Sequence, residues 1–218
     1  MHRSWLPYGV IRTVRNAGLL VVASVGLAFA NPVTIAAFGD SLTQGFGLVP
    51  DEGFVPQLEA WLTAQGAEVT VINAGVSGDT TAGGLSRIEW TLTPQVDAIL
   101  VALGGNDLLR GMDPAASRAN LEGILKIATA RDLKVLLIGM QAPSNYGADY
   151  KAAFDSIYPE LAETYGAALH PNFLGALTSR EDRSAGEVWY CFTESMLTEE
   201  ACWGERSFCT TMVTRSCW

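Results

Sequence analysis

Short apolar segments alternate with amphipathic segments along the chain from Val33 to about Leu177. The apolar segments are nearly continuous, which is typical of strands whose two faces are both covered by helices. We expect strands at Val33–Phe38, Val69–Asn73, Ala98–Leu103, Lys134–Met140 and Ala168–His170, and helices at Phe54–Gln65, Thr80–Leu92, Ala115–Ala130 and Asp149–Tyr165. This alternation predicts a mostly parallel sheet in a three-layer α/β fold, with an active site at the carboxyl ends of the strands.

Glycine-rich turns follow the first three predicted strands, at residues 39–47, 73–81 and 104–111. The first turn places Ser41 at the exit of a buried strand. A serine hydroxyl is a weak nucleophile until its backbone is held tightly and a base takes its proton. The glycines around it let the chain turn sharply and let a substrate approach the backbone. This pattern indicates acyl transfer.

Attack by the Ser41 hydroxyl on an ester or thioester carbonyl would create a tetrahedral oxyanion. Each preorganised hydrogen-bond donor to such an oxyanion lowers the barrier by about 3–4 kcal/mol. The candidate donors are the backbone N–H of Ser41, the backbone N–H of Gly78 and the side-chain amide of Asn106. The alternative for Asn106 is a turn residue that bonds its own backbone. Because three such turns follow successive strands, we favour the donor role.

The three turns together resemble the SGNH (GDSL) hydrolase superfamily, and most closely its bacterial periplasmic esterases and thioesterases. The resemblance extends through residues 141–147 and 150–159 and covers about 33–177. It implies a metal-free, cofactor-free enzyme with a flavodoxin-like sheet of about five strands. It also implies that Ser41 is the nucleophile, that Gly78 and Asn106 complete the oxyanion hole, and that Asn145, Tyr146 and Gly147 border the acyl pocket.

The family's general base is a histidine in an Asp-x-x-His-Pro segment before a C-terminal helix, and this chain does not show that segment. The sequence has two histidines, His2 and His170. His170 precedes Pro171, but Ala167 stands where the aspartate is expected. His170 also falls in a segment that resembles the family's fifth strand. It is therefore a weak candidate for the base, and we interpret it as a strand-end residue.

Residues 178–218 differ in composition from the rest of the chain. They contain all four cysteines and three of the six tryptophans, with no isoleucine and no lysine. No helical or alternating apolar period is present there. We interpret this segment as a replacement of the family's C-terminal helix and catalytic dyad, caused by a frameshift or by a genuine cysteine-bridged appendage. No two cysteines are spaced Cys-x-x-Cys, so a zinc site is not expected.

The first thirty residues have the pattern of a signal peptide. Three arginines precede an apolar run from Ala17 to Ala30, and a small-x-small motif predicts cleavage before Asn31. The apolar run is shorter than the ~20 residues that a spanning helix needs, although a retained membrane anchor is the alternative. Removal of this leader changes the formal charge from −9 to −12, since 11 basic residues then stand against 23 acidic residues. So acidic a protein is a poor partner for nucleic acid or anionic membrane.

These observations predict a periplasmic or secreted domain at residues 31–177 that hydrolyses acyl or aryl esters, acyl-CoA or lysophospholipids. Its activity is expected to be impaired because no aspartate–histidine pair can be assigned. The alternative is a non-catalytic protein that binds acyl chains or glycans in the retained pocket. The sequence does not determine the preferred acyl-chain length, the cysteine pairing or the oligomeric state.

Overall fold

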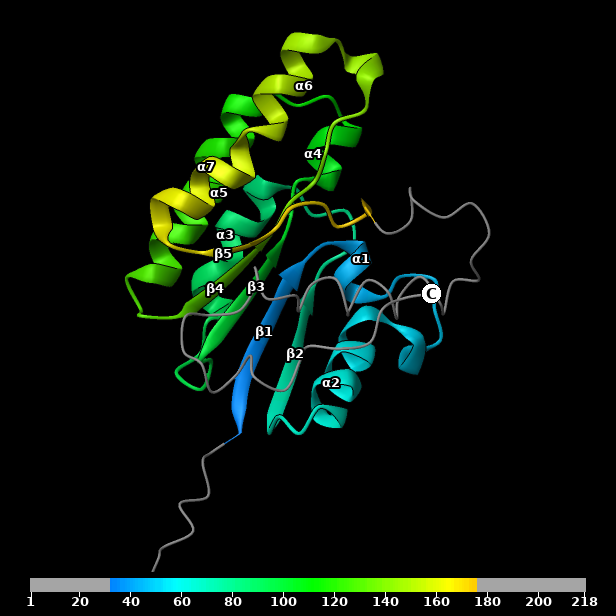
Figure 1. The fold of residues 1–218 in the computed structure, drawn as a ribbon, viewed down its shortest axis with the longest axis vertical. Helices are drawn as coiled ribbons and strands as arrows, with labels where there is room; N and C mark the ends of the chain where they lie inside the picture. The colour runs from blue at the N-terminus through cyan, green and yellow to red at the C-terminus, as the bar shows by residue number, and fades with distance from the viewer. Residues whose placement is uncertain (1–31, 176–218) are drawn as a thin grey trace, which may run out of the picture. The chain divides into compact units, whose positions relative to one another are not determined.

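The computed structural model describes residues 32–175, which form a five-stranded parallel sheet with helices on both faces (Figure 1). The strands are β1 (Val33–Gly39), β2 (Val69–Gly75), β3 (Ala98–Ala102), β4 (Lys134–Ile138) and β5 (Ala168–His170). Their order across the sheet is β2-β1-β3-β4-β5, and every neighbouring pair is parallel. All five predicted strands are confirmed, with ends that shift by two residues at most. The predicted leader at 1–30 and the segment 178–218 lie outside the described residues.

Seven α-helices and two 3-10 turns connect the strands of the described region. They are α1 (Ser41–Gln44), α2 (Phe54–Ala64), α3 (Thr81–Thr91), α4 (Gly105–Leu109), α5 (Pro114–Thr129), α6 (Ala148–Asp155) and α7 (Ile157–Tyr165), with η1 (Pro50–Glu52) and η2 (Ser144–Tyr146). Two helix starts follow directly from the sequence. Asp113 caps α5 before Pro114, and the Thr80 hydroxyl caps α3 by accepting from the backbone N–H of Gly83.

The prediction of one continuous helix at Asp149–Tyr165 is wrong. The structure divides this segment into α6 and α7, with Ser156 between them. Pro159 explains the division, because proline has no N–H for an intrahelical bond and its ring clashes with the carbonyl four residues earlier. Here that carbonyl belongs to Asp155, the last residue of α6. Pro159 stands in the first turn of α7, where the missing N–H costs nothing.

The direction of the crossovers puts the helices in two layers. The chain steps from β1 to β2 on one side and then returns past β1 to β3, β4 and β5 on the other. Because such crossovers are right-handed, α2 covers one face and α3, α5 and α7 cover the opposite face (Figure 1). The reversal lies between β1 and β3. Ligands in open α/β sheets bind at such a reversal point, outside the carboxyl ends of the strands.

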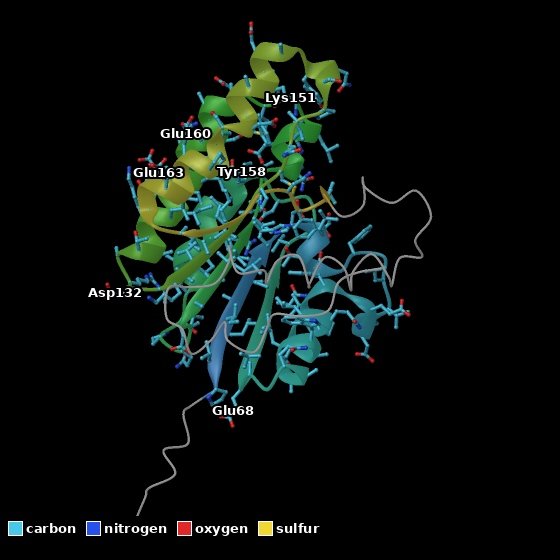
Figure 2. The ribbon with its side chains drawn as sticks, viewed as in Figure 1. Glu68, Asp132, Lys151, Tyr158, Glu160 and Glu163 are labelled. Carbon is cyan, nitrogen blue, oxygen red and sulfur yellow. The ribbon has the colours of Figure 1, made fainter. Side chains whose placement is uncertain are left out.

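The core lies on the two faces of the central strands. All five residues of β3 are buried, which explains the continuous apolar run in the sequence. On α7, Tyr158 is fully buried and points toward the sheet, whereas Glu160 and Glu163 lie on the outer side of the helix (Figure 2). Within residues 32–175, no helix combines the length and the apolar character needed to cross a membrane.

Candidate active site

Ser41 is the first residue of the short helix α1, directly after β1. Asp40 caps this helix: its Oδ1 accepts from the backbone N–H of Leu42 at 3.0 Å. The N–H groups of a helix's first turn have no partner inside the helix, so the Ser41 N–H is available to a ligand. The Ser41 hydroxyl is half-buried and has no hydrogen-bond partner within the described part of the chain.

Two glycines allow α1 to lie directly on the ends of β1 and β2. A Cβ atom on Gly39 would collide with the side chain of Thr43 and come within 2.8 Å of the Ala102 carbonyl oxygen. A Cβ on Gly75 would be 2.8 Å from the carbonyl oxygen of Asp40. Real Cβ atoms do not approach backbone this closely, so only glycine fits at either position. The turn that carries Ser41 is therefore fixed by close backbone contact with two neighbouring strands.

The turn after β2, which carries Gly78, is hydrogen-bonded to α1, the helix that begins at Ser41. The Gln44 side-chain oxygen accepts from the backbone N–H of Ser77 at 3.0 Å and from the Ser77 hydroxyl. The Gln44 carbonyl accepts from the Asn73 amide at 3.2 Å, and Val76 N–H donates to the Gly39 carbonyl at 3.0 Å. These bonds fix the second turn relative to Ser41.

The backbone of Gly78 is left-handed, and its carbonyl is held by Arg110. Gly78 has φ +82°, which favours glycine. Its carbonyl accepts from the Arg110 guanidinium at 2.8 Å. No acceptor for its N–H is found among the described residues. The Gly78 carbonyl is thus bound by Arg110, while the Gly78 N–H, which belongs to the preceding peptide unit, is available to a ligand.

Arg87 on α3 connects the carboxyl ends of β1 and β2. Its guanidinium donates to the carbonyls of Gly39 and Ala74 at 3.0 and 2.9 Å, and pairs with Asp79 at 2.6 Å. It also lies over the Phe38 ring, 4.0 Å from the centroid. The planar fork of arginine suits three acceptors around one group. Arg87 therefore connects the serine turn to Asp79, the residue after Gly78.

Asn106 lies in the short helix α4 after β3, and its amide nitrogen donates to Oδ2 of Asp40 at 3.1 Å. Asp40 is only 3% exposed. Burial raises the pKa of the Asp40 carboxyl, and the hydrogen bonds from Leu42 and Asn106 act in the opposite direction. The carboxyl group thus joins the serine turn to the turn after β3. The Asn106 side chain thus bonds Asp40 rather than its own backbone, which was the alternative, and its role as an oxyanion donor stays a prediction.

A second buried carboxylate joins the turn after β3 to α3. Asp107 is fully buried and accepts from the backbone N–H and the hydroxyl of Thr81 at 2.8 and 2.5 Å. It also accepts from the Ser117 hydroxyl at 3.0 Å, and Asn120 donates to the Thr81 hydroxyl. Buried carboxylates need several such donors to offset their desolvation. This cluster fixes the helix that follows Gly78 against the helix that carries Asn106.

The segment Asn145–Gly147 lies beside α4. The Tyr146 hydroxyl donates to the Leu108 carbonyl at 2.8 Å, and its ring stacks on Tyr150 with centroids 5.0 Å apart. A Cβ on Gly111 would touch the same Tyr146 ring at 3.7 Å. The structure thus brings this segment to the turn that carries Asn106. Its role as a border of an acyl pocket stays a prediction.

His170 lies at the end of β5, away from this cluster. Three strand spacings separate β5 from β1 in the sheet, which is roughly 14 Å at ~4.8 Å per spacing. The ring is buried, and its Nε2 is 3.1 Å from the Asn172 carbonyl oxygen. A general base must be within hydrogen-bond reach of the proton that it takes. From this position His170 does not reach Ser41.

The family described as GDSL-like lipase/acylhydrolase matches residues 37–188, a range that contains all three glycine-rich turns. This chain belongs to that family. The esterase TesA of Pseudomonas aeruginosa is 43% identical over 142 residues, which are 65% of this chain and 71% of TesA. Thioesterase 1/protease 1/lysophospholipase L1 of Escherichia coli K12 is 36% identical over 143 residues, 65% of this chain and 67% of that protein.

Solved structures agree with this membership in the GDSL family. The crystal structure of AlinE4, an esterase of the SGNH-hydrolase family, superposes with a TM-score of 0.67 at 47% sequence identity. The superposition covers 71% of this chain and 86% of AlinE4. The three-layer α/β fold predicted from the sequence is therefore confirmed as the SGNH hydrolase fold. The family match continues past Leu177, the predicted end of the domain, into residues that the structure does not describe.

Several residues that connect the three turns have only a weak signal in the sequence of this GDSL-family chain. Asp40, Gln44, Arg87 and Arg110 all connect the turns, yet only their positions in or near the glycine-rich segments could have drawn notice. Asp40 has the clearest signal, because an acidic residue stands directly before the serine that is predicted to be the nucleophile. Among the described residues, no group of three or more histidine, cysteine or acidic side chains could hold a metal.

Proposed function

We propose that this chain is a serine hydrolase of carboxylic esters and thioesters, acting on small acyl or aryl substrates of the acyl-CoA and lysophospholipid type. One observation carries the proposal. Ser41 and the two other turns with candidate oxyanion donors follow adjacent strands, and side-chain hydrogen bonds connect them. The names of the relatives, which include an esterase, a thioesterase and a lysophospholipase, support the same reaction class.

In the proposed reaction the Ser41 oxygen attacks the substrate carbonyl carbon and its proton passes to a base. The negative charge on the carbonyl oxygen is stabilised by the N–H groups of Ser41 and Gly78 and by the Asn106 amide. Collapse of this intermediate releases the alcohol or thiol, which takes the proton, and leaves an acyl-serine. Water then hydrolyses the acyl-serine and restores the Ser41 hydroxyl. No metal or cofactor takes part in this scheme.

We propose that the chain is impaired because its sequence offers no suitable base. His2 lies in the predicted leader, and His170 lies three strands from Ser41. In serine proteases, loss of the base costs on the order of a million-fold in kcat, while the oxyanion hole and binding still give ~10³–10⁴ over water. We expect weak turnover, about 10³–10⁴-fold above the reaction in water. Added imidazole is expected to increase it by acting as the base.

Hydrolysis of p-nitrophenyl butyrate tests this proposal. The protein lacking residues 1–30 is compared with its Ser41→Ala variant, with and without imidazole. Imidazole itself attacks such esters, so the Ser41→Ala protein supplies the matched background. We expect turnover above this background in the wild type, increased by imidazole. Equal rates for the two proteins under both conditions would contradict the proposal.

The position of His170, three strands from Ser41, favours a second candidate function, a non-catalytic protein that binds acyl chains or glycans. This candidate predicts that a medium-chain fatty acid or an oligosaccharide binds the wild type and the Ser41→Ala variant equally in calorimetry. No Ser41-dependent turnover would accompany that binding. Acylation of Ser41, detected by mass spectrometry after incubation with the ester, would exclude it.

The proposed setting is the periplasm or the extracellular space, after cleavage of the leader behind Ala30. The formal charge of −12 for the remaining chain supports a small-molecule partner rather than nucleic acid or an anionic membrane. Residues 178–218 are proposed to replace the family's C-terminal helix. Translation of the coding DNA in the other frames after Leu177 tests this, since a frameshift would hide an Asp-x-x-His-Pro segment there.

A further inference from the structure

Both carboxylate oxygens of Asp40 are in use, and each bonds a different part of the site. Oδ1 caps the nucleophile helix through the backbone N–H of Leu42, and Oδ2 accepts from the amide nitrogen of Asn106 at 3.1 Å. The side chain is almost completely buried. Gly105 makes room for it, because a Cβ there would be 3.3 Å from Oδ2. The carboxylate is therefore enclosed between the two turns.

An ionised carboxylate can accept hydrogen bonds but cannot donate them. Its bond to Asn106 therefore determines which end of the amide faces Asp40, and that end is the nitrogen. The nitrogen carries two hydrogens, and only one of them is used. Among the described residues, the second hydrogen has no protein partner. It remains available for a ligand.

We propose that Asp40 is a positioning residue that fixes the side-chain amide of Asn106 so that an N–H, and not the carbonyl oxygen, is presented to the substrate oxyanion. The proposal rests on the oxyanion role proposed above for Asn106. Without the carboxylate the amide could rotate by half a turn. Its oxygen would then face the developing negative charge and oppose the reaction.

Helix capping alone does not account for a carboxylate at this position. Asparagine and aspartate cap helix N-termini about equally well, and asparagine carries no charge to desolvate. Burial raises the pKa of Asp40, which shows that the charged form is held in an unfavourable environment. A negative charge beside an oxyanion site is a further cost. A carboxylate only accepts hydrogen bonds, whereas the asparagine amide also donates them. Only the carboxylate therefore fixes which end of the Asn106 amide faces residue 40.

Asp40→Asn is the informative substitution. The new amide keeps the cap by accepting from Leu42, and its NH₂ group then faces Asn106. Two NH₂ groups cannot bond each other, so Asn106 is expected to turn its oxygen toward residue 40. Asp113→Asn is the matched control, because Asp113 also caps a helix, α5, through a backbone N–H at 2.9 Å, and does not contact Asn106.

Side-chain amide signals in ¹⁵N–¹H correlation spectra provide a readout independent of activity. The pair of signals absent from Asn106→Ala identifies the Asn106 amide. We expect one downfield proton in the wild type, because of the bond to a carboxylate, and its loss in Asp40→Asn but not in Asp113→Asn. An unchanged Asn106 pair in Asp40→Asn would overturn the proposal, whatever the protein's activity.

Ester hydrolysis with added imidazole provides the second readout. We expect kcat to fall by about 10²–10³-fold in Asp40→Asn, the usual loss for one oxyanion donor, with a smaller change in KM. Asn106→Ala should fall similarly, and the double variant should fall no further. If the fold-losses in kcat of the two single variants multiply in the double variant, Asp40 does not act through Asn106. If the wild type shows no Ser41-dependent turnover, the proposed function fails, whereas the amide spectra still decide the role of Asp40.

Discussion

The carboxyl ends of β1 and β5 are held in place by different kinds of contact. At the end of β1, the Gly39 carbonyl accepts from Val76 and from Arg87, and the next residue, Asp40, bonds Asn106 on a third segment. At the end of β5, the His170 carbonyl accepts from the backbone N–H of Gly139, and its ring lies against the carbonyl of Asn172 two residues on.

The two strand ends differ in how many segments of the chain contribute side-chain contacts to them. Side chains from several segments fix the position of Ser41 and of its candidate oxyanion donors. The His170 ring lies three strands away from Ser41, and one of its contacts is with the backbone carbonyl of Asn172 in its own loop. Electrostatic stabilisation of a transition state depends on donors that are fixed in advance. The contacts at the β1 end are of the kind that such a site would need, and four substitutions test how far the contrast with β5 extends.

Gly39→Ala should produce the largest effect. The new methyl group meets backbone at the Ala102 carbonyl, which cannot move without disturbing the sheet, so we expect about 3 kcal/mol less free energy of unfolding. Urea denaturation provides the measurement. Gly123→Ala on α5 is the control, because its methyl meets only the end of the Leu85 side chain. Equal losses in both variants would show that the β1 end is not unusually constrained.

Arg87→Met should have the next largest effect. It removes the donors to Gly39 and Ala74 and leaves Asp79 without its partner, so we expect about 2 kcal/mol of destabilisation, by comparison with other hydrogen bonds to charged groups. Thermal denaturation compares it with Lys126→Met, which breaks an exposed i,i+4 pair with Glu122 worth about 0.3–0.5 kcal/mol. A smaller loss for Arg87→Met than for Lys126→Met would show that Arg87 does not hold the ends of β1 and β2 together.

Asp40→Asn should change the dependence of stability on pH. The folded protein holds the Asp40 proton more tightly than the unfolded chain, since burial raises the pKa of this carboxyl. As pH rises from the ordinary carboxyl range through the raised pKa, the wild type therefore loses stability relative to Asp40→Asn, and the difference is constant above it. Urea denaturation between pH 4 and 7 measures this difference. If the stability advantage of Asp40→Asn over the wild type becomes smaller as pH rises, ionised Asp40 does not destabilise the folded protein.

His170→Asn should have the smallest effect on activity. Because β5 is three strands from β1, we expect the Ser41-dependent rate of ester hydrolysis with imidazole to remain within about twofold of wild type. The folded fraction is measured in parallel by circular dichroism, because the ring is buried. A loss of the imidazole-independent rate in a fully folded His170→Asn protein would show that His170 serves as the base.

Much of the fold could be predicted because the apolar pattern of each segment matches its position in the sheet. The five strands are apolar runs with turns at their ends, and a parallel sheet needs that pattern on every strand. The one misjudged helix shows a limit of periodicity, since Asp149–Tyr165 keeps its apolar stripe while Pro159 divides it. Ser41, Gly78 and Asn106 could be proposed as site residues because glycine turns and polar residues stand together in the sequence.

By itself, the sequence determined the order of strands and helices, the family, and the three turns that carry the candidate site. Only the tertiary structure decided how those turns are held together. Asp40 and Asn106 are 66 positions apart, and Arg87 is 48 positions from Gly39, so no local pattern links them. Their contacts exist because parallel strands bring their carboxyl ends to one edge of the sheet. The same geometry puts His170 at the end of a strand too far from Ser41 to act on it.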